Sequence, residues 1–313
     1  VSAAPEQIDL PPATIKPFQP GPGTISIDGA SICIIDALDK IHPITGQLIP
    51  PHDAAYLQAN HLFSASQKLI RLCAARNEFV DFQLILANQA KDAKIQASFD
   101  DPAISATISR FVCVKSKLGP LPDPLIPLSA AITETLPGQK FAAFIVDVYV
   151  PHTAKPGNHT GHHTITSGTH ATTLKIDLTV WNFALPDKLS FIPEMNCYGL
   201  PADDREWYRL AHIHRTNLNR LAYNWRGQVA EDAAPRWTGQ DFDWTTFDQR
   251  YTPILDGSAF NDLPRKGIPV DAFYLPLNAN WPGSIETGFK GGYCADSALT
   301  GDYRTRFVHA SRK

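Results

Sequence analysis

The chain has 313 residues and a formal net charge of −3 at pH 7, and charged residues make up only 19% of it. This balance offers no basic surface for a phosphate backbone, so we expect no nucleic-acid partner. No apolar run reaches the roughly 18–20 residues that a membrane-crossing helix needs, so we expect no membrane span. The length is typical of about two domains.

Residues 1–22 form a proline-rich N-terminal segment, and the chain begins with a valine although its one methionine is Met195. Such a start is typical of a mature exported chain after signal cleavage, although an artificially shortened chain would begin in the same way. We therefore expect a secreted, cell-surface or periplasmic protein.

The cysteines contain no C-x-x-C pair, which argues against a zinc ribbon or a thioredoxin-like site. Their number is odd, so at least one thiol has no partner within the chain. Their disulfide pairing does not follow from the sequence. They are Cys33, Cys73, Cys113, Cys197 and Cys294.

Residues 23–184 consist of short strand-like segments separated by turn signals, with almost no helical periodicity. Regularly spaced short strands of this kind predict an antiparallel β-sandwich. The segments include "TISIDGASICII", "KLIRLCAA", "EFVDFQLILA", "KIQASF", "ATISRFVCVKS", "FAAFIVDVYV", "GHHTITS" and "TLKIDLTVWNF".

Five of the 11 histidines lie within residues 151–170, which raises the question of a metal site. A hairpin turn at Ser167-Gly168 would place Ile165 opposite His170 and His163 opposite Thr172. Only His163 and His170 then share a face, whereas a zinc site needs three or four protein ligands. We expect surface or turn roles and no metal for the group His152, His159, His162, His163 and His170.

Residues 185–313 have a different pattern, in which strand-like segments alternate with amphipathic helices. The predicted strands are "LSFIPEMN", "RLAYNW" and "VDAFYLPLNANW". These are the first βα units of an incomplete TIM-like (β/α) barrel, because a closed barrel takes eight units and about 250 residues. Further strands could come from a longer polypeptide or from a second chain, or the domain could be a smaller open α/β sheet.

Three helices are predicted in this second domain. The first follows Asp203 or Asp204, with an inward face of Trp207, Leu210, Ala211, His214 and Leu218. The second ends at Gly257, with an inward face of Phe247, Tyr251, Ile254 and Leu255. The third begins within "YRTRFVHASRK".

Carboxylates, amides and aromatic rings follow the three predicted strands. In a (β/α) barrel the chemistry lies at the carboxyl ends of the strands, and these side chains are the types that bind sugar hydroxyls and stack on sugar rings. Alternatively, the asparagines shape turns and the tryptophans are buried. The candidate substrate-binding residues are Glu194, Asn196, Tyr198, Asn224, Trp225, Asn278, Asn280 and Trp281.

No nucleotide or cofactor motif is evident, because the glycine-rich "GFKGGY" (288–293) lacks the Lys-Ser/Thr ending of a phosphate-binding loop. We expect no cofactor.

The segments "AARNEFVDFQLIL", "VDVYVPHTAKPGNHTG" and "LTVWNFALPDKLSF" resemble the N-terminal sandwich of family-123-like glycoside hydrolases and their secreted relatives. The later "YRLAHIHRTNLNRLAYNW" and "PVDAFYLPLNANWP" are similar to the start of the barrel that follows it. The resemblance covers nearly the whole chain. It implies a carbohydrate ligand and, in the catalytic members, removal of an N-acetylated galactosamine-type sugar.

The same resemblance implies an adjacent Asp-Glu pair as the catalytic centre, and this chain has none. The lookalike Glu231-Asp232 has the reverse order. Two functions therefore remain open. The first is a glycoside hydrolase whose acid pair lies beyond residue 313, and the second is a non-catalytic carbohydrate-binding or extracellular assembly protein.

Overall fold

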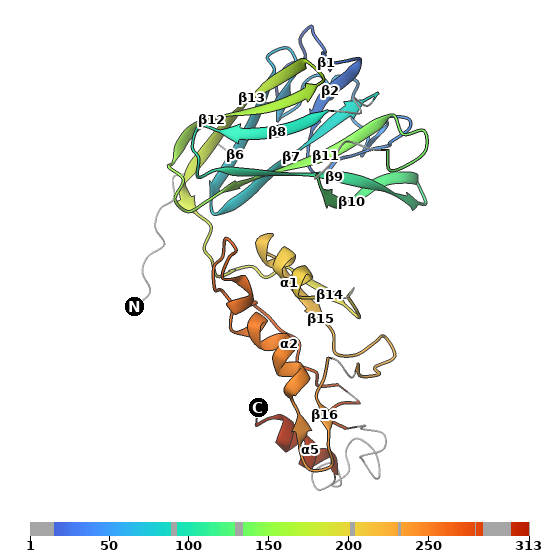
Figure 1. Cartoon of the computed structure of the whole chain (residues 1–313), viewed down its shortest axis with the longest axis vertical. Coiled ribbons are helices and arrows are strands. Elements are labelled where there is room, and N and C mark those ends of the chain that lie inside the picture. Colours follow the sequence, from blue (N-terminus) through green and yellow to red (C-terminus); the bar gives the residue numbers. More distant parts are fainter. Residues whose placement is uncertain are drawn as a thin grey trace. The chain divides into compact units, whose positions relative to one another are not determined.

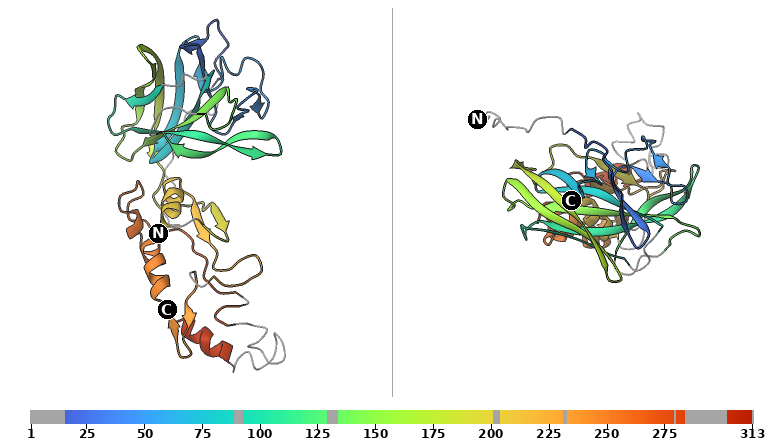
Figure 2. Two further views of the ribbon diagram at one scale, coloured as in Figure 1. Left: turned by 45° about the vertical axis from the view of Figure 1, so that its right-hand side comes forward. Right: turned by 90° about the horizontal axis from the view of Figure 1, so that it is seen from above.

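The computed structural model describes residues 16–88, 93–128, 134–200, 204–230, 233–278, 280–283 and 302–312. Cys294, Glu231-Asp232 and the loop 288–293 lie outside these ranges. The chain forms two compact units, Val1–Leu185 and Pro186–Lys313 (Figures 1 and 2). The first is built of strands, and the second contains the helices.

The first unit contains two large sheets that enclose one core. The six-stranded sheet has the order β1 (Ile25–Ile27), β2 (Ala30–Ile35), β7 (Glu78–Ala87), β11 (Phe141–Val150), β9 (Ser105–Ser116) and β10 (Gly119–Pro127). The five-stranded sheet has the order β5 (Phe63–Ser64), β6 (Leu69–Arg76), β13 (His170–Ala184), β12 (Gly157–Ser167) and β8 (Lys94–Phe99).

The alternation of apolar and polar residues along the strands determines which side chains form the core of this sandwich. Successive strand residues point to opposite faces, so every second side chain is buried. The alternation expected along β13 is confirmed, because Leu174, Ile176, Leu178 and Val180 are all buried. They pack with residues of the facing sheet, among them Phe82 and Phe144.

One strand pair departs from the antiparallel prediction. The central strands β6 and β13 run parallel, with Leu69 beside Lys175 and Ala74 beside Val180. A parallel pair needs a long crossover instead of a hairpin, and here the chain passes through the other sheet between the two strands. Strand-length patterns carry no information on direction, so this pairing did not follow from the sequence.

The predicted register of the β12–β13 hairpin is wrong by two residues. The ladder places Ser167 opposite His170 and His163 opposite Leu174. The turn is therefore Gly168-Thr169, and Gly168 has a φ of 54°. Glycine in the first central position is the arrangement of a type II′ turn, whereas the prediction placed it second.

The histidines of residues 151–170 do not converge. The surface or turn role expected for the group is wrong for His163, which is fully buried in the sandwich core. His170 is exposed, with its Nδ1 atom 2.7 Å from an Asp28 carboxylate oxygen. His159 contacts the Lys155 carbonyl oxygen at 2.8 Å. Within the described ranges, no three His, Cys, Asp or Glu side chains are grouped as a metal site would require.

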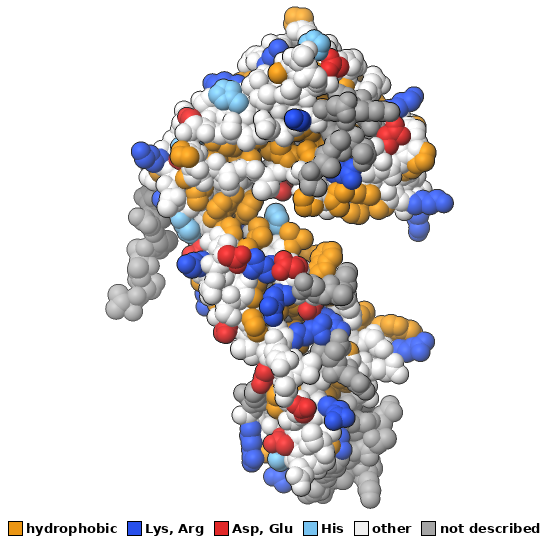
Figure 3. Space-filling view, in the orientation of Figure 1, with side chains coloured by type: hydrophobic (Ala, Val, Ile, Leu, Met, Phe, Trp, Pro, Cys, Tyr) orange, Lys and Arg blue, Asp and Glu red, His pale blue; other side chains and the backbone are white. Residues whose placement is uncertain are grey.

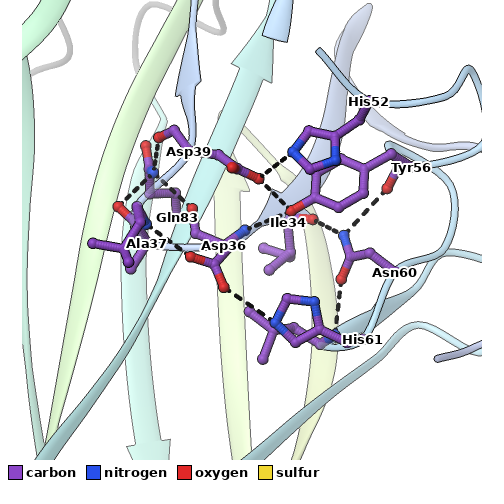
Figure 4. A network of polar contacts seen from close by, with 11 residues as sticks. Ile34, Asp36, Ala37, Asp39, His52, Tyr56, Asn60, His61 and Gln83 are labelled. Atoms are coloured by element: carbon purple, nitrogen blue, oxygen red, sulfur yellow. Dashed lines mark hydrogen bonds and ion pairs between the residues drawn. The ribbon is translucent and has the colours of Figure 1, made fainter. Parts of the chain in front are cut away.

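Residues 36–61 cover part of the outer face of the six-stranded sheet and include β3 (Lys40–Ile41) and β4 (Leu48–Ile49). A polar network fixes this segment, as Figure 4 shows. The buried Gln83 amide donates to the carbonyl oxygens of Asp36, Ala37 and Asp39. The Asp39 carboxylate accepts a hydrogen bond from the Tyr56 hydroxyl and lies 3.0 Å from His52 Nε2. The network pairs most of its buried polar groups, which is a structural role, although Gln83 Oε1 has no hydrogen-bond partner among the described residues.

The second unit begins with a parallel strand pair joined by a helix. Its elements are β14 (Glu194–Cys197), α1 (Asp204–Ile213), β15 (Asn217–Arg220), β16 (Arg236–Trp237), β17 (Phe242–Asp243), α2 (Thr245–Leu255), the 3₁₀ turn η1 (Ser258–Phe260) and α5 (Asp302–Ala310). Among the described helices, none has the length and apolarity for crossing a bilayer. Figure 3 shows charges of both signs interspersed over the visible surface of this unit.

The structure corrects several boundaries in this unit. The first strand begins at Glu194, near the predicted end, and the second ends at Arg220, where the prediction began it. The segment expected as a third strand, 270–281, forms no strand among its described residues and carries only the isolated bridge Asn278–Trp281. A complete (β/α) barrel is therefore not shown.

The face predicted for the first helix is only partly correct. Ala211 packs against the core of the unit, and Leu218, which lies on β15, belongs to that core. Trp207 and Leu210 are 43% and 51% exposed and His214 is exposed, whereas the buried residues of α1 are Asp204, Tyr208 and His212. The prediction placed Trp207 inward because the side chain is hydrophobic. In the structure Tyr208 and His212 make contacts between α1 and the rest of the unit. In α2 the inward face is confirmed for Tyr251 and Ile254, and Phe247 packs against them, but the prediction is wrong for Leu255, which is 41% exposed.

Candidate functional site

A polar face on the parallel strand pair is the main candidate for a site. The ladder places Glu194 beside Asn217 and Asn196 beside Asn219. Partners in a parallel pair point to the same side of the sheet, as do residues two apart on one strand. The polar face is therefore formed by Glu194, Asn196, Asn217 and Asn219, while Leu218 points away into the core of the unit.

The Asn217 side chain links β15 to the backbone of Ala272, within a segment that pairs with no strand among the described residues. Its side-chain Nδ2 donates to the Ala272 carbonyl oxygen at 2.8 Å, and its Oδ1 accepts from the Ala272 amide at 3.2 Å. The same Nδ2 lies 3.1 Å from Asn219 Oδ1. Asn217 therefore joins the segment around Ala272 to β15 and has no donor left over for a ligand.

Asn219 has an unused donor. The residue is 1% exposed, and its Nδ2 atom is buried without a hydrogen-bond partner among the described residues. A buried amide left unpaired costs roughly 1–3 kcal/mol, so such groups are rare in folded proteins. Its neighbour across the ladder on the same face is the exposed Asn196.

Glu194 supplies the carboxylate of the polar face. It is exposed, and the Tyr274 hydroxyl donates to its Oε2 at 3.1 Å. The carboxylate has further acceptor positions, because each oxygen carries two lone pairs. Tyr274 and Tyr198 are also exposed. Tyr198 follows directly after β14, at the carboxyl end of the strand.

Three of the predicted asparagines use their side chains to shape loops. Asn224 Oδ1 accepts from the amides of Arg226 and Gln228. Asn278 Oδ1 accepts from the Asn280 amide at 2.7 Å, and Asn280 Nδ2 donates to the Gly227 carbonyl oxygen at 2.6 Å. These bonds are typical of Asx turns and tie the 224–228 loop to the 278–281 segment.

The two predicted tryptophans occupy opposite environments. Trp281 is 6% exposed, packs against Phe242 and Trp244, and donates its indole N–H to the Pro235 carbonyl oxygen. Trp225 is 71% exposed, with the Arg226 guanidinium 4.6 Å from its ring centre. Trp281 is thus a core residue, while Trp225 presents an open aromatic face.

Sequence reasoning missed Asn217, Asn219 and Tyr274. The available signal was the "NLN" alternation at 217–219, in which a polar residue stands on either side of an apolar one, as on a half-buried strand. The "NLN" segment ends at Asn219, directly before the predicted second strand "RLAYNW", and was therefore left out of it. Tyr274 was within the third predicted strand but was not singled out.

Several other ionisable groups of this unit have structural roles or are buried. Arg265 is buried and lies 2.8 Å from an Asp271 carboxylate oxygen. Arg209 contacts both carboxylate oxygens of Asp262 at 2.8 Å. Burial raises the pKa of the Cys197 thiol, which disfavours the reactive thiolate. None of these groups belongs to the polar face.

A cavity of about 610 Å³ lies between α2, α5 and the 273–281 segment. Its walls are almost entirely aromatic and aliphatic, including Trp244, Phe247, Leu277 and Phe307. Its polar lining residues are Asp248, Thr252 and Ser311.

Comparison with known families finds no matching family profile, and comparison with curated proteins finds no match. Among solved structures, a family 123 glycoside hydrolase from Clostridium perfringens aligns with 12% identity and a TM-score of 0.39, over 60% of this chain and 41% of that chain. The titin M3 domain aligns with 15% identity and a TM-score of 0.19, over 36% of this chain and 92% of that chain.

This chain therefore spans less than half the length of the Clostridium perfringens enzyme. The titin M1 domain aligns similarly, with 10% identity and a TM-score of 0.20, over 37% of this chain and 94% of that chain. Similarities this remote do not assign a family or an activity.

Proposed function

We propose that this chain binds a carbohydrate through the polar face of β14 and β15, as part of a glycoside-hydrolase-like protein. The observation that carries the proposal is the polar face itself. It presents the exposed Glu194 carboxylate and Asn196 amide on a single side of a sheet, above the buried Asn217 and Asn219 amides, and the Tyr274 hydroxyl contacts Glu194. Amides and carboxylates bind sugar hydroxyls, and aromatic rings stack on the apolar faces of sugar rings.

Each residue has a distinct role in this proposal. Glu194 accepts hydrogen bonds from sugar hydroxyls, and the exposed Asn196 amide donates to acceptor oxygens. Asn217 positions the face through its two bonds to Ala272. Tyr198 supplies a ring for stacking just beyond the carboxyl end of β14.

The strand order supports a place for this face inside a barrel. A β14-α1-β15 unit with parallel strands is the repeat from which (β/α) barrels are built, and their sites lie at the carboxyl ends of the strands. We therefore propose that further strands come from another part of the polypeptide or from a second chain. The proposed setting is outside the cytoplasm, as a secreted, cell-surface or periplasmic protein.

Hydrolysis needs more than the polar face offers. A glycosidase commonly uses two carboxyl groups about 5–9.5 Å apart, or one with an additional group from the substrate. Glu194 is the one carboxylate on the polar face. In the first form of the proposal, the catalytic acid pair lies outside these 313 residues. In the second, the protein binds the glycan without cleaving it, which the single carboxylate favours.

The test is calorimetric titration of the chain with β-linked N-acetylgalactosamine disaccharide, chosen because of the family resemblance. Glu194→Gln and Asn196→Ala should each weaken binding about tenfold or more, since each removes a hydrogen bond to the ligand. Glu206→Gln is the matched control, because Glu206 is an exposed carboxylate on α1 away from the polar face.

Equal affinity in Glu194→Gln and in the unaltered chain would refute the proposal, as would no heat of binding at millimolar sugar. Release of p-nitrophenol from the corresponding aryl glycoside separates the two forms. Turnover by the complete protein favours the enzyme, and binding without turnover favours the non-catalytic protein.

A further inference from the structure

The loop that follows β15 ends in a tight turn whose side chains the proposed function leaves unused. Residues 222–230 fold back on themselves as a short hairpin. At its tip the Gly227 amide donates to the Asn224 carbonyl oxygen at 2.9 Å. Trp225 and Arg226 are therefore the two central residues of a β-turn, and this turn is the hairpin tip.

Hydrogen bonds hold the hairpin tip in one conformation. Asn224 Oδ1 accepts from the amides of Arg226 and Gln228, and Asn224 Nδ2 donates to Gln228 Oε1 at 3.0 Å. Gly227 has a φ of 75°, a conformation that favours glycine, and its carbonyl oxygen accepts from Asn280 Nδ2 at 2.6 Å. A ligand at the hairpin tip therefore meets a backbone that is already ordered, which lowers the entropic cost of binding.

The two central side chains of the turn expose an aromatic ring and an unpaired charge. Trp225 is 71% exposed although the Arg226 guanidinium lies 4.6 Å from its ring centre, so the other face of the ring is open. Tryptophan is highly buried on average, so a ring this exposed is unusual. Arg226 is also exposed, and its guanidinium forms no ion pair with any residue that the structure describes.

The hairpin leaves the strand pair at the end where (β/α) sites are found. Because β14 and β15 run parallel, their carboxyl ends lie at the same edge, and Tyr198 follows β14 there. The Leu221 amide continues this edge by donating to the Cys197 carbonyl oxygen at 2.8 Å, and the hairpin begins at the next residue. A sugar chain bound at the polar face can therefore continue toward the hairpin.

The chemistry of the hairpin tip selects a sugar that carries an acid group. The open face of Trp225 stacks on the apolar side of a sugar ring, and the planar fork of donors on Arg226 matches a carboxylate. The acid group belongs to the sugar ring at the hairpin tip, because the Glu194 carboxylate on the polar face would repel it. A neutral sugar would leave the Arg226 charge unused.

We propose that the hairpin tip makes the carbohydrate site selective for an acidic oligosaccharide, with a uronic acid stacked on Trp225 and paired with Arg226. This inference rests on the proposed function, because it assigns the substrate class of the same site. Trp225 contributes affinity for any sugar chain that reaches the hairpin tip, whereas Arg226 determines the preference for the acid.

The test compares two disaccharides by calorimetric titration of the full chain. β-Glucosyl-N-acetylgalactosamine and β-glucuronosyl-N-acetylgalactosamine, with the same linkage, differ in a single group, which is a hydroxymethyl in the first and a carboxylate in the second. The unaltered chain should bind the acidic disaccharide about fivefold more tightly at low ionic strength. This preference should disappear at about 1 M salt, because salt screens an exposed ion pair.

Three variants assign the preference to the hairpin tip. Arg226→Gln should bind the two disaccharides equally and keep the affinity of the unaltered chain for the neutral one. Trp225→Ala should weaken the binding of both by about fivefold, because it removes the stacking ring. Arg205→Gln is the matched control and should retain the preference, because Arg205 is an exposed arginine on α1.

The outcomes separate this inference from the proposed function. Equal affinity of the unaltered chain for the two disaccharides would overturn the inference and leave the proposed function in place. A preference for the acid that persists in Arg226→Gln would do the same. Binding of neither disaccharide at millimolar concentration would overturn both.

Discussion

A buried, neutral histidine should make the first unit sensitive to acid. His163 is fully buried, its ring meets Phe82 edge-on at 5.4 Å, and neither ring nitrogen has a hydrogen-bond partner among the described residues. Burial lowers the pKa of the His163 imidazole from 6.5 to about 4. His163 is therefore harder to protonate in the folded state than in the unfolded chain.

The size of the effect follows from the pKa difference. Below pH 6.5 the unfolded chain binds a proton at His163 that the folded chain does not, so the free energy of unfolding falls as the pH drops. The loss grows by about 1.4 kcal/mol per pH unit and ends near pH 4, where the folded form is also protonated. The total is about 3 kcal/mol, a large part of the 5–15 kcal/mol that stabilises a typical domain.

The assay is urea unfolding of the first unit within the full chain, followed by circular dichroism at pH 7, 5.5 and 4. Other groups also titrate in this window, so the informative quantity is the difference between variants. His163→Leu should lose about 3 kcal/mol less than the unaltered chain between pH 7 and pH 4. His162→Leu, on the exposed side of the same strand, should behave like the unaltered chain. Equal losses in His163→Leu and the unaltered chain would refute the reasoning.

Three further predictions concern other buried groups. Burial also lowers the pKa of His212 to about 4, so His212→Phe should reduce the acid sensitivity of the second unit, measured by fluorescence-detected urea unfolding between pH 7 and pH 4. Gln83→Leu should lower the free energy of unfolding of the first unit by about 2–4 kcal/mol, because three carbonyl oxygens lose their donor; an unchanged urea midpoint would contradict this. Burial raises the pKa of the Cys33 thiol to about 12, so this thiol should react with an aromatic disulfide reagent only after denaturation, as peptide mapping of the labelled chain can establish.

The sandwich was the more predictable unit because the alternation that identifies its core residues can be read within each strand. Alternation along β13 identified Leu174, Ile176, Leu178 and Val180 as core residues, and the structure buries all four. The hairpin register was not predictable to the same degree. Ser167-Gly168 and Gly168-Thr169 are both acceptable two-residue turns, and a shift of two residues keeps every side chain on the same face, so the alternation does not distinguish the two registers.

The candidate site was predicted only in part, for a physical reason. Glu194 and Asn196 were identified because carboxylates and amides near a strand are visible in a sequence. Asn219 was missed because its significance depends on burial and on the absence of a partner, both of which arise from the pairing of β14 with β15. Trp281 was predicted to contact a ligand only because it is aromatic. In the structure its indole N–H already donates a hydrogen bond to the Pro235 carbonyl oxygen.

The parallel pairing of β6 with β13 has a consequence for how the first unit is made in the cell. A ribosome completes β6 more than one hundred residues before the matching part of β13, since Leu69 pairs with Lys175. Contacts between such distant residues must wait for the whole intervening chain and slow folding. The edge of β6 and its apolar side chains are therefore exposed throughout synthesis of the first unit, and this nascent stage is where a chaperone would be needed.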